Sequence, residues 1–183
     1  PLLKRLAEWA RAEGLPLMVH AAESPEEVAF LARGEGPLRE VYGRFAKTPW
    51  TPPGTTPVRH LHALGVLGPT TLLVHGVQVD EEEVGLLAET GTKVVLCPRS
   101  NANLEVGEAP LALYAKHGVE LALGTDSRGS SPDLDVKNEA RFLWGRAEPR
   151  LLVRALTRGG YRALGLPTPR LTRGTPLSLV HFL

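Results

Sequence analysis

Cysteine is almost absent from this chain of 183 residues, since Cys97 is the only one. A single cysteine excludes an internal disulfide framework and favours a reducing compartment, so we expect a cytoplasmic protein. No apolar run approaches the roughly 20 residues that a membrane helix needs, and the first residues lack the three-part pattern of a signal peptide. The formal net charge is +1, without a basic run or an aromatic-rich basic patch, which gives no support to binding of nucleic acid.

Two further elements are missing. The chain does not begin with methionine, and Pro1 leads directly into an amphipathic helical pattern, which we interpret as a cut end. No Gly-rich phosphate-binding loop follows any predicted strand, so nucleotide binding by an open doubly wound sheet has no support. What remains is an ordinary globular composition, with 43% hydrophobic and 22% charged residues, long enough to bury a substantial core.

Three short apolar runs end in a side chain that can bind a metal or carry a proton. They are LMVHAAE over residues 17–23, TLLVHG over 71–76 and LALGTDS over 121–127. A fourth apolar run, residues 93–96, leads into Cys97-Pro98. The first run begins at Leu15 and is uninterrupted to Val19, which predicts a strand covered on both faces.

Helical patterns separate these runs. We predict helices over residues 2–13, 24–33, 57–67, 80–89, 109–116, 133–144, 149–157 and 159–165, with an irregular Pro- and Gly-rich segment over 34–56 that carries Trp50. Strands alternating with helices predict a parallel sheet with right-handed crossovers. Four strand–helix units are too few to close an eight-stranded barrel, and an open doubly wound sheet is the structural alternative. His20, His75 and Asp126 all follow strand ends, where a (β/α)8 barrel carries its catalytic residues, so we favour the barrel.

These side chains suit metal-assisted hydrolysis. A zinc or iron ion held by His and Asp ligands, with one open position, lowers the pKa of bound water and yields hydroxide near neutral pH. Glu23 follows His20 by three residues, beside such a water, where it can move a proton to a substrate nitrogen. Each residue also has a structural interpretation: His20 and His75 as ordinary strand-end or loop histidines, Glu23 as a helix start and Asp126 as a turn or cap residue.

In this order the motifs resemble those of the amidohydrolase superfamily, in particular its amine-hydrolysing branch of chlorohydrolase-like proteins and nucleoside or base deaminases. His20-Ala21-Ala22-Glu23 is similar to the HxxE of the fifth barrel strand, and Val74-His75-Gly76 to the sixth-strand histidine segment. Cys97-Pro98-Arg99-Ser100-Asn101 resembles the seventh-strand CPxSN, and Gly124-Thr125-Asp126-Ser127 the eighth-strand GTDS. The resemblance implies an α/β fold: residues 1–170 as the C-terminal half of a TIM barrel, about strands 5–8, and residues 171–183 as the start of a small β-sandwich.

The resemblance also implies roles for the residues. His20 and Asp126 are implied metal ligands, Glu23 the proton shuttle, and His75 the residue that orients the water or substrate and in some members also contacts the metal. Asp126 shares in activating the water. The implied cofactor is one divalent metal ion, zinc before iron.

Ser100 and Asn101 are implied to shape the substrate pocket. The implied reaction is deamination of an N-heterocyclic, purine-like amine through a metal-bound hydroxide. The alternatives are hydrolysis of another C–N or a C–Cl bond, or a non-catalytic fragment or degenerate subunit.

One departure from the family pattern is large. The HxH ligand pair of the first barrel strand has no counterpart before His20, and the spelling His60-Leu61-His62 falls in a predicted helix, where we assign it no ligand role. His117, His181 and Cys97 likewise receive no catalytic role. We therefore expect a fragment, a companion polypeptide carrying the N-terminal half of the barrel, or self-association that covers the exposed sheet edge.

Overall fold

The computed structural model describes residues 2–46, 48–168 and 173, and these residues form an α/β structure. Its strands are β1 (Leu17–Ala21), β2 (Thr71–His75), β3 (Lys93–Leu96) and β4 (Leu121–Leu123). Its helices are α1 (Leu2–Ala12), α2 (Pro25–Arg33), α3 (Pro37–Phe45), α4 (Pro57–Ala63), α5 (Glu81–Thr90), α6 (Pro98–Asn103), α7 (Leu111–Lys116), α8 (Val136–Phe142), α9 (Pro149–Arg154), the π-helix η1 (Ala155–Gly159) and α10 (Gly160–Ala163).

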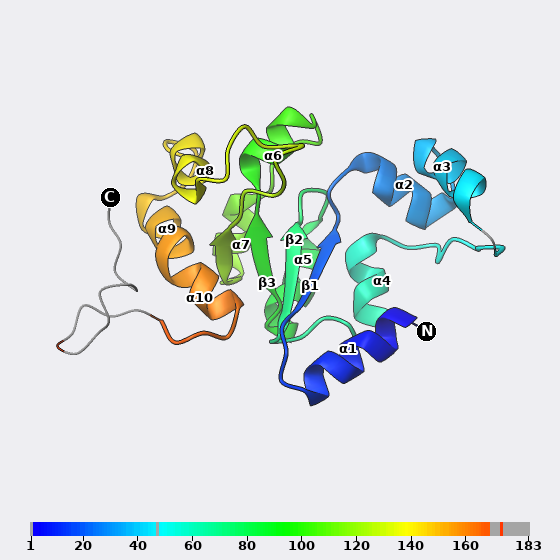
Figure 1. Ribbon diagram of the computed structural model, residues 1–183, viewed down its shortest axis with the longest axis horizontal. Helices are drawn as coiled ribbons and strands as arrows, with labels where there is room; N and C mark the ends of the chain where they lie inside the picture. Colours follow the sequence, from blue (N-terminus) through cyan, green and yellow to red (C-terminus); the bar gives the residue numbers. More distant parts are fainter. Residues whose placement is uncertain (1, 47, 169–172, 174–183) are drawn as a thin grey trace.

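The four strands form one parallel sheet in the order β1-β2-β3-β4 (Figure 1). Leu17 pairs with Thr71, Leu72 with Lys93, and Val94 with Leu121. Neighbours in sequence are therefore neighbours in the sheet, as in a barrel wall. A doubly wound sheet reverses its strand order at a switch point, and the described strands contain no such reversal.

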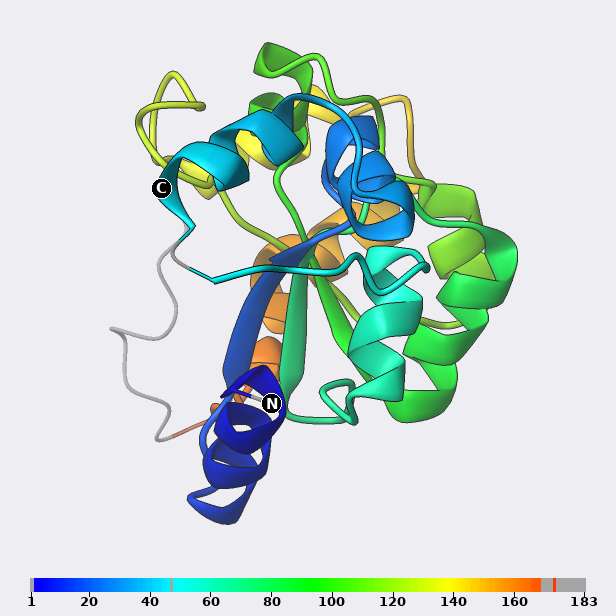
Figure 2. The same cartoon turned by 90° about the vertical axis from the view of Figure 1, so that its right-hand side faces the viewer.

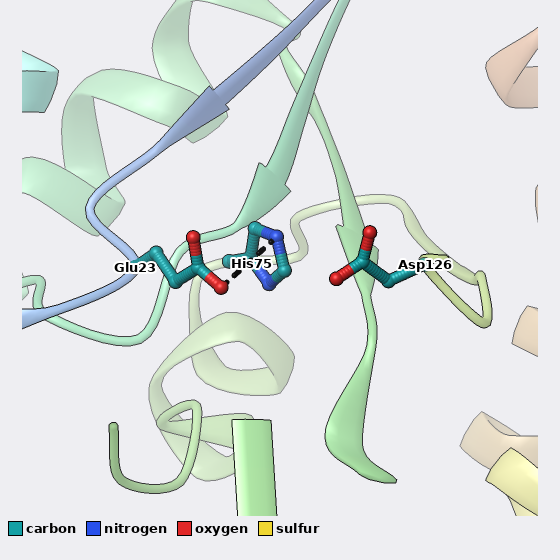
Figure 3. A group of neighbouring side chains, drawn as sticks. All are labelled: Glu23, His75 and Asp126. Carbon is teal, nitrogen blue, oxygen red and sulfur yellow. Dashed lines mark ion pairs between the residues drawn. The ribbon is translucent and has the colours of Figure 1, made fainter. Parts of the chain in front are cut away.

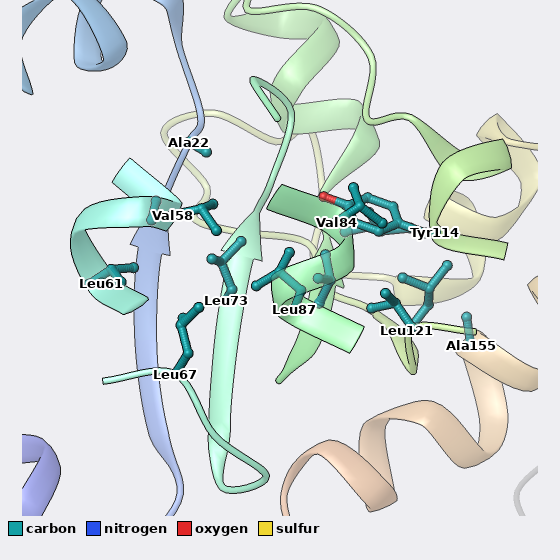
Figure 4. Packing of buried hydrophobic residues seen from close by; sticks show 14 of the residues in the cluster. Ala22, Val58, Leu61, Leu67, Leu73, Val84, Leu87, Tyr114, Leu121 and Ala155 are labelled. Atoms are coloured by element: carbon teal, nitrogen blue, oxygen red, sulfur yellow. The ribbon is translucent and has the colours of Figure 1, made fainter. Parts of the chain in front are cut away.

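The sheet buries apolar side chains on both faces because residues alternate across it. One face packs on α4, α5 and α7 through a cluster that includes Leu73, Leu87 and the fully buried Tyr114 (Figures 2 and 4). On the opposite face Val74 and Val95 meet Ala163 of α10 in a smaller cluster. Strand β2 lies between the two clusters and is buried along its whole length, which makes it the centre of the core.

Strand β1 corrects one sequence expectation. It begins at Leu17 rather than Leu15, and its burial alternates instead of being continuous. The side chains of Met18, which is 53% exposed, and of His20 lie on the open face. The apolar run was interpreted as covered on both faces, and this was wrong because the described residues cover only the face opposite Met18 and His20.

The helix starts at the site were predicted correctly from capping signals. Ser24 accepts a hydrogen bond from the Glu27 backbone at the start of α2. Asp80 and Glu83 form a reciprocal capping box at the start of α5, which places three glutamates in its first turn.

Two helices were missed. Residues 34–56 were expected to be irregular, yet α3 forms there with Pro37 in its first turn. Proline fixes the backbone angle that a helix start needs, so this Pro initiates rather than breaks a helix. Tyr42 of this helix contacts the rings of Phe30 and Trp50. The rings of Phe30 and Trp50 stack on each other with centroids 4.2 Å apart.

Proline also starts helix α6, where Pro98 follows β3.

Near the C-terminus, the two helices predicted over 149–157 and 159–165 are one continuous segment, α9–η1–α10. The predicted terminal strand over 174–183, with residues 171–172 of the proposed second module, lies outside the described residues. Among the described residues, no helix combines the length and the apolarity that spanning a membrane requires.

Candidate active site

Three side chains from three strand ends converge at one edge of the sheet. Glu23 follows β1, His75 ends β2 and Asp126 follows β4 (Figure 3). One ligand atom from each lies within 4.8 Å of the others. His75 is 1% exposed and Glu23 28%, so the cluster is buried on one side and open on the other.

The imidazole of His75 is oriented by Asn101. Its Nδ1 lies 2.8 Å from the side-chain oxygen of Asn101, which can only accept, so Nδ1 donates. In the neutral ring Nε2 then carries a lone pair. This buried atom has no hydrogen-bond partner in the described part of the chain, and it lies 3.5 Å from Oε1 of Glu23. Two lone pairs facing each other repel, and a cation between them removes that repulsion.

The carboxylate of Asp126 is held in its charged form. Burial favours the neutral acid, but hydrogen bonds from the hydroxyls of Ser130 and Ser100 outweigh it, and the pKa of Asp126 falls below its ordinary value. Both hydroxyls donate to Oδ2 at 2.7 Å. The backbone of Ser127 adds a further hydrogen bond to this carboxylate.

Glu23 is placed by the turn between β1 and α2. The backbone N–H of Glu23 donates to Oε2 of Glu27 at 2.8 Å. The carbonyl of Ala22 accepts from the backbone of Val77 and of Gln78, both at 2.8 Å, which ties this turn to the one after β2. Burial raises the pKa of Glu27 above its ordinary value.

The backbone is strained where the site residues leave the strands. Ala22, His75 and Asp126 have φ values of 54°, 74° and 59°, and the fourth described non-glycine residue in this region is Glu105. Such conformations cost of order 1–3 kcal/mol each and cluster at functional sites. After His75 the chain continues in the same left-handed region at Gly76, where a Cβ atom would collide with the hydroxyl of Tyr114.

The predicted ligand His20 lies beside this cluster. Its ring centroid is 5.3 Å from that of His75, but its nitrogens are not in the group that lies within 4.8 Å. Its ligand role stays a prediction. Ser100 and Asn101 are buried and contact Asp126 and His75, while their predicted contact with substrate stays untested.

Sequence reasoning missed three supporting residues. Ser130 holds Asp126, Glu27 holds the backbone of Glu23, and the hydroxyl of Tyr114 donates to the carbonyl of Gly76. Ser130 left a signal as a serine one short loop after a predicted ligand, and Glu27 as the third residue of a predicted helix start. Cys97 is buried as expected, and burial raises the pKa of its thiol to about 12.

The donor set fits a divalent metal of borderline softness. His75 and Asp126 bring together an imidazole nitrogen and a carboxylate oxygen, two ligand types of a catalytic zinc site, and the Glu23 carboxylate beside them can act as an acid or base. Nε2 of His75 makes no hydrogen bond to the described residues and lies 3.5 Å from Oε1 of Glu23, so a cation held by both atoms, a proton or a metal ion, would satisfy them.

The sequence of this chain is similar to those of known deaminases. Aminodeoxyfutalosine deaminase of Deinococcus radiodurans is 42% identical over 189 residues, covering 94% of this chain and 44% of the relative. A 5-methylthioadenosine/S-adenosylhomocysteine deaminase of Syntrophobacter fumaroxidans is 35% identical, covering 90% of this chain and 36% of the relative. The chain thus spans less than half the length of these relatives.

Solved structures show the same architecture. A zinc-bound adenosine deaminase from Xanthomonas campestris superposes with a TM-score of 0.71 at 30% identity, over 89% of this chain and 35% of that one. A triazine hydrolase variant superposes with a TM-score of 0.76 at 21% identity, over 95% and 37%, which shows a shared fold. The sequence profile of the amidohydrolase family matches residues 1–182, and this chain belongs to that family.

Proposed function

We propose that this chain carries strands five to eight of a metal-dependent deaminase barrel that acts on an adenosine-like N-heterocyclic amine. The juxtaposition of Glu23, His75 and Asp126, with Nε2 of His75 unpartnered, is the observation that carries the proposal. The deaminases among its relatives and the zinc bound to the Xanthomonas structure support the choice of reaction and metal.

Asp126 would hold the metal through its carboxylate, with His20 as a second ligand and His75 as a further contact. A bound zinc ion would act as a Lewis acid and lower the pKa of a water molecule to near neutrality. Asp126 is suited to this role because its hydroxyl partners keep it ionised.

Glu23 would move the proton. Its carboxylate lies at the open side of the cluster and is 28% exposed, within reach of both the attacking water and a substrate nitrogen. His75 cannot rotate freely, because Asn101 holds its other nitrogen at 2.8 Å, so it would orient the water or the substrate.

The experiment compares Glu23→Gln with Glu26→Gln, an exposed glutamate in the same segment. Ammonia release from adenosine, 5-methylthioadenosine and aminodeoxyfutalosine is measured together with zinc content. We expect Glu23→Gln to keep zinc and lose about 100-fold or more in turnover, as removal of a general acid–base does. Equal activity of the two variants would reject the role of Glu23.

The remainder of the barrel wall would come from a longer protein of which this chain is a fragment, from a companion polypeptide or from a second copy of the chain. Among the described residues no strand pairs with the outer edge of β1, and Met18 is exposed beside it. Open parallel edges are prone to pair with other chains. Intact mass and sedimentation of the purified protein test this: a stable monomer that binds no zinc and releases no ammonia would favour a non-catalytic chain.

A further inference from the structure

The first turn of α6 receives its cap from another helix. Cys97, at the N-cap position, makes no side-chain hydrogen bond to this turn. Oε2 of Glu139, on α8, instead accepts a hydrogen bond from the backbone N–H of Arg99 at 3.0 Å. A carboxylate at a helix start satisfies an otherwise unpaired donor and interacts favourably with the helix dipole. The start of α6 is therefore fixed by α8.

Glu139 occupies an unusual environment for its residue type. It is 0% exposed, whereas glutamate is almost never fully buried unless it is paired. Its Oε1 lies 3.6 Å from the Arg99 guanidinium, which itself makes two hydrogen bonds to Asp133, at 2.9 and 2.8 Å. Buried ion pairs contribute little net stability because of their desolvation cost, so stability alone does not account for this carboxylate.

The capped turn carries the two side chains that orient the candidate site. Ser100 and Asn101 follow Arg99 directly and are 0% and 2% exposed. Ser100 donates to Asp126 at 2.7 Å, and Asn101 accepts from His75 at 2.8 Å. A shift of this turn would move both contacts at once.

We propose that Glu139 is a positioning residue: by holding the Arg99 backbone it places Ser100 and Asn101 against Asp126 and His75. Its effect on turnover rests on the proposed function, whereas its effect on the His75 imidazole does not. The role is distinct from that of Asp133. Its carboxylate accepts hydrogen bonds from the Arg99 side chain, the Asp135 backbone and the Asn138 side chain.

The test reads the tautomer of His75 by ¹⁵N NMR of the full chain without metal, at a pH where the ring is neutral. The His75 signals are assigned from their loss in His75→Asn. In the wild type we expect the Nδ1–H form. In Glu139→Ala we expect a mixture with the Nε2–H form, because Asn101 no longer meets Nδ1. Glu139→Gln should restore the Nδ1–H form, since its amide oxygen still accepts from Arg99.

Asp133→Asn is the matched control, because it weakens the Arg99 ion pair but leaves the backbone cap in place. We expect it to keep the Nδ1–H form. Glu139→Asp keeps the charge but shortens the side chain by one methylene, so it should show the mixture of Nδ1–H and Nε2–H forms. This variant replaces Glu139→Ala as the test if Glu139→Ala does not fold. A wild-type tautomer in a folded Glu139→Ala or Glu139→Asp protein overturns the proposal.

Zinc affinity and ammonia release separate this inference from the proposed function. We expect Glu139→Ala to bind zinc about 10- to 100-fold more weakly, as loss of an outer support does. A tautomer change in a protein that never releases ammonia would reject only the proposed function. Normal zinc affinity and an unchanged tautomer in an active Glu139→Ala protein would reject only the role of Glu139.

Discussion

The side-chain oxygen of Asn101 lies 2.8 Å from Nδ1 of His75, and both residues are buried. Asn101 belongs to α6 and His75 to the end of β2, so a helix after one strand fixes the ring at the end of its neighbour. This contact determines which nitrogen faces Glu23, and it leads to the first prediction.

Asn101→Leu should weaken zinc binding about 10- to 100-fold, since the imidazole loses the acceptor that sets its tautomer. Asn103→Leu, an exposed asparagine in the same helix, is the control and should leave zinc affinity unchanged. Calorimetric titration of zinc measures both. Equal affinities for the two variants would contradict the orienting role of Asn101.

Two adjacent glycines test the packing of η1 on β4. A Cβ atom on Gly159 would overlap the carbonyl of Leu121 and lie 3.1 Å from Cα of Ala122, whereas one on Gly160 meets nothing within 4 Å. Gly159→Ala should therefore lower the free energy of unfolding by about 1–3 kcal/mol or more. Gly160→Ala should raise it by up to about 1 kcal/mol through helix propensity. Urea unfolding measures the stability of both variants. An equal loss of stability in both would contradict the close approach of Gly159 to β4.

Tyr114→Phe should reduce stability at neutral pH by about 1–3 kcal/mol, because it leaves the buried carbonyl of Gly76 without its donor. Burial, and secondarily the charge of Glu83, raise the pKa of Tyr114 above its ordinary value of 10.0. The folded-state pKa exceeds the unfolded one, so the neutral phenol stabilises fully below about pH 10 and this contribution is lost as the pH rises further.

The difference in unfolding free energy between wild type and Tyr114→Phe should therefore shrink above about pH 10. Urea unfolding at several pH values measures it, with Tyr161→Phe, on α10, as the control. A difference that stays constant at alkaline pH would show that Tyr114 does not titrate abnormally.

The ring cluster on α2 and α3 should control local opening. Trp50→Ala removes the ring stacked 4.2 Å from Phe30, so backbone amides of α3 should exchange hydrogen faster while those of β2 and β3 stay protected. Trp144→Ala, at a residue 68% exposed, should leave both unchanged. If the amides of α3 exchange hydrogen as slowly in Trp50→Ala as in the wild type, the stacking does not hold this helix.

Much of the fold was predictable because periodicity and capping are local signals. The buried run of β2, the capping box at Asp80 and the strand-end positions of His75 and Asp126 all follow from neighbouring residues. The missed helices α3 and α6 both begin at a proline. Pro37 was included in an irregular segment, although proline also starts helices.

Contacts between distant elements were not predictable in the same way. No local pattern shows that Glu139 caps α6 or that Tyr114 holds the carbonyl of Gly76, because each contact joins segments that only the folded sheet brings together. The open face of β1 was missed for a similar reason: its apolar run has the composition of a covered strand, and only the packing of distant elements determines which face is covered.

The sheet order also has a consequence for how the chain folds. Strands β2, β3 and β4 are each separated by a short helical crossover, whereas β1 must find β2 across α2, α3 and α4. Loop closure costs more entropy as the intervening chain lengthens, so β1 is expected to dock after the other three strands. His75 and Asp126 would then be in place before Glu23 arrives, and assembly of the site would report the last step of folding.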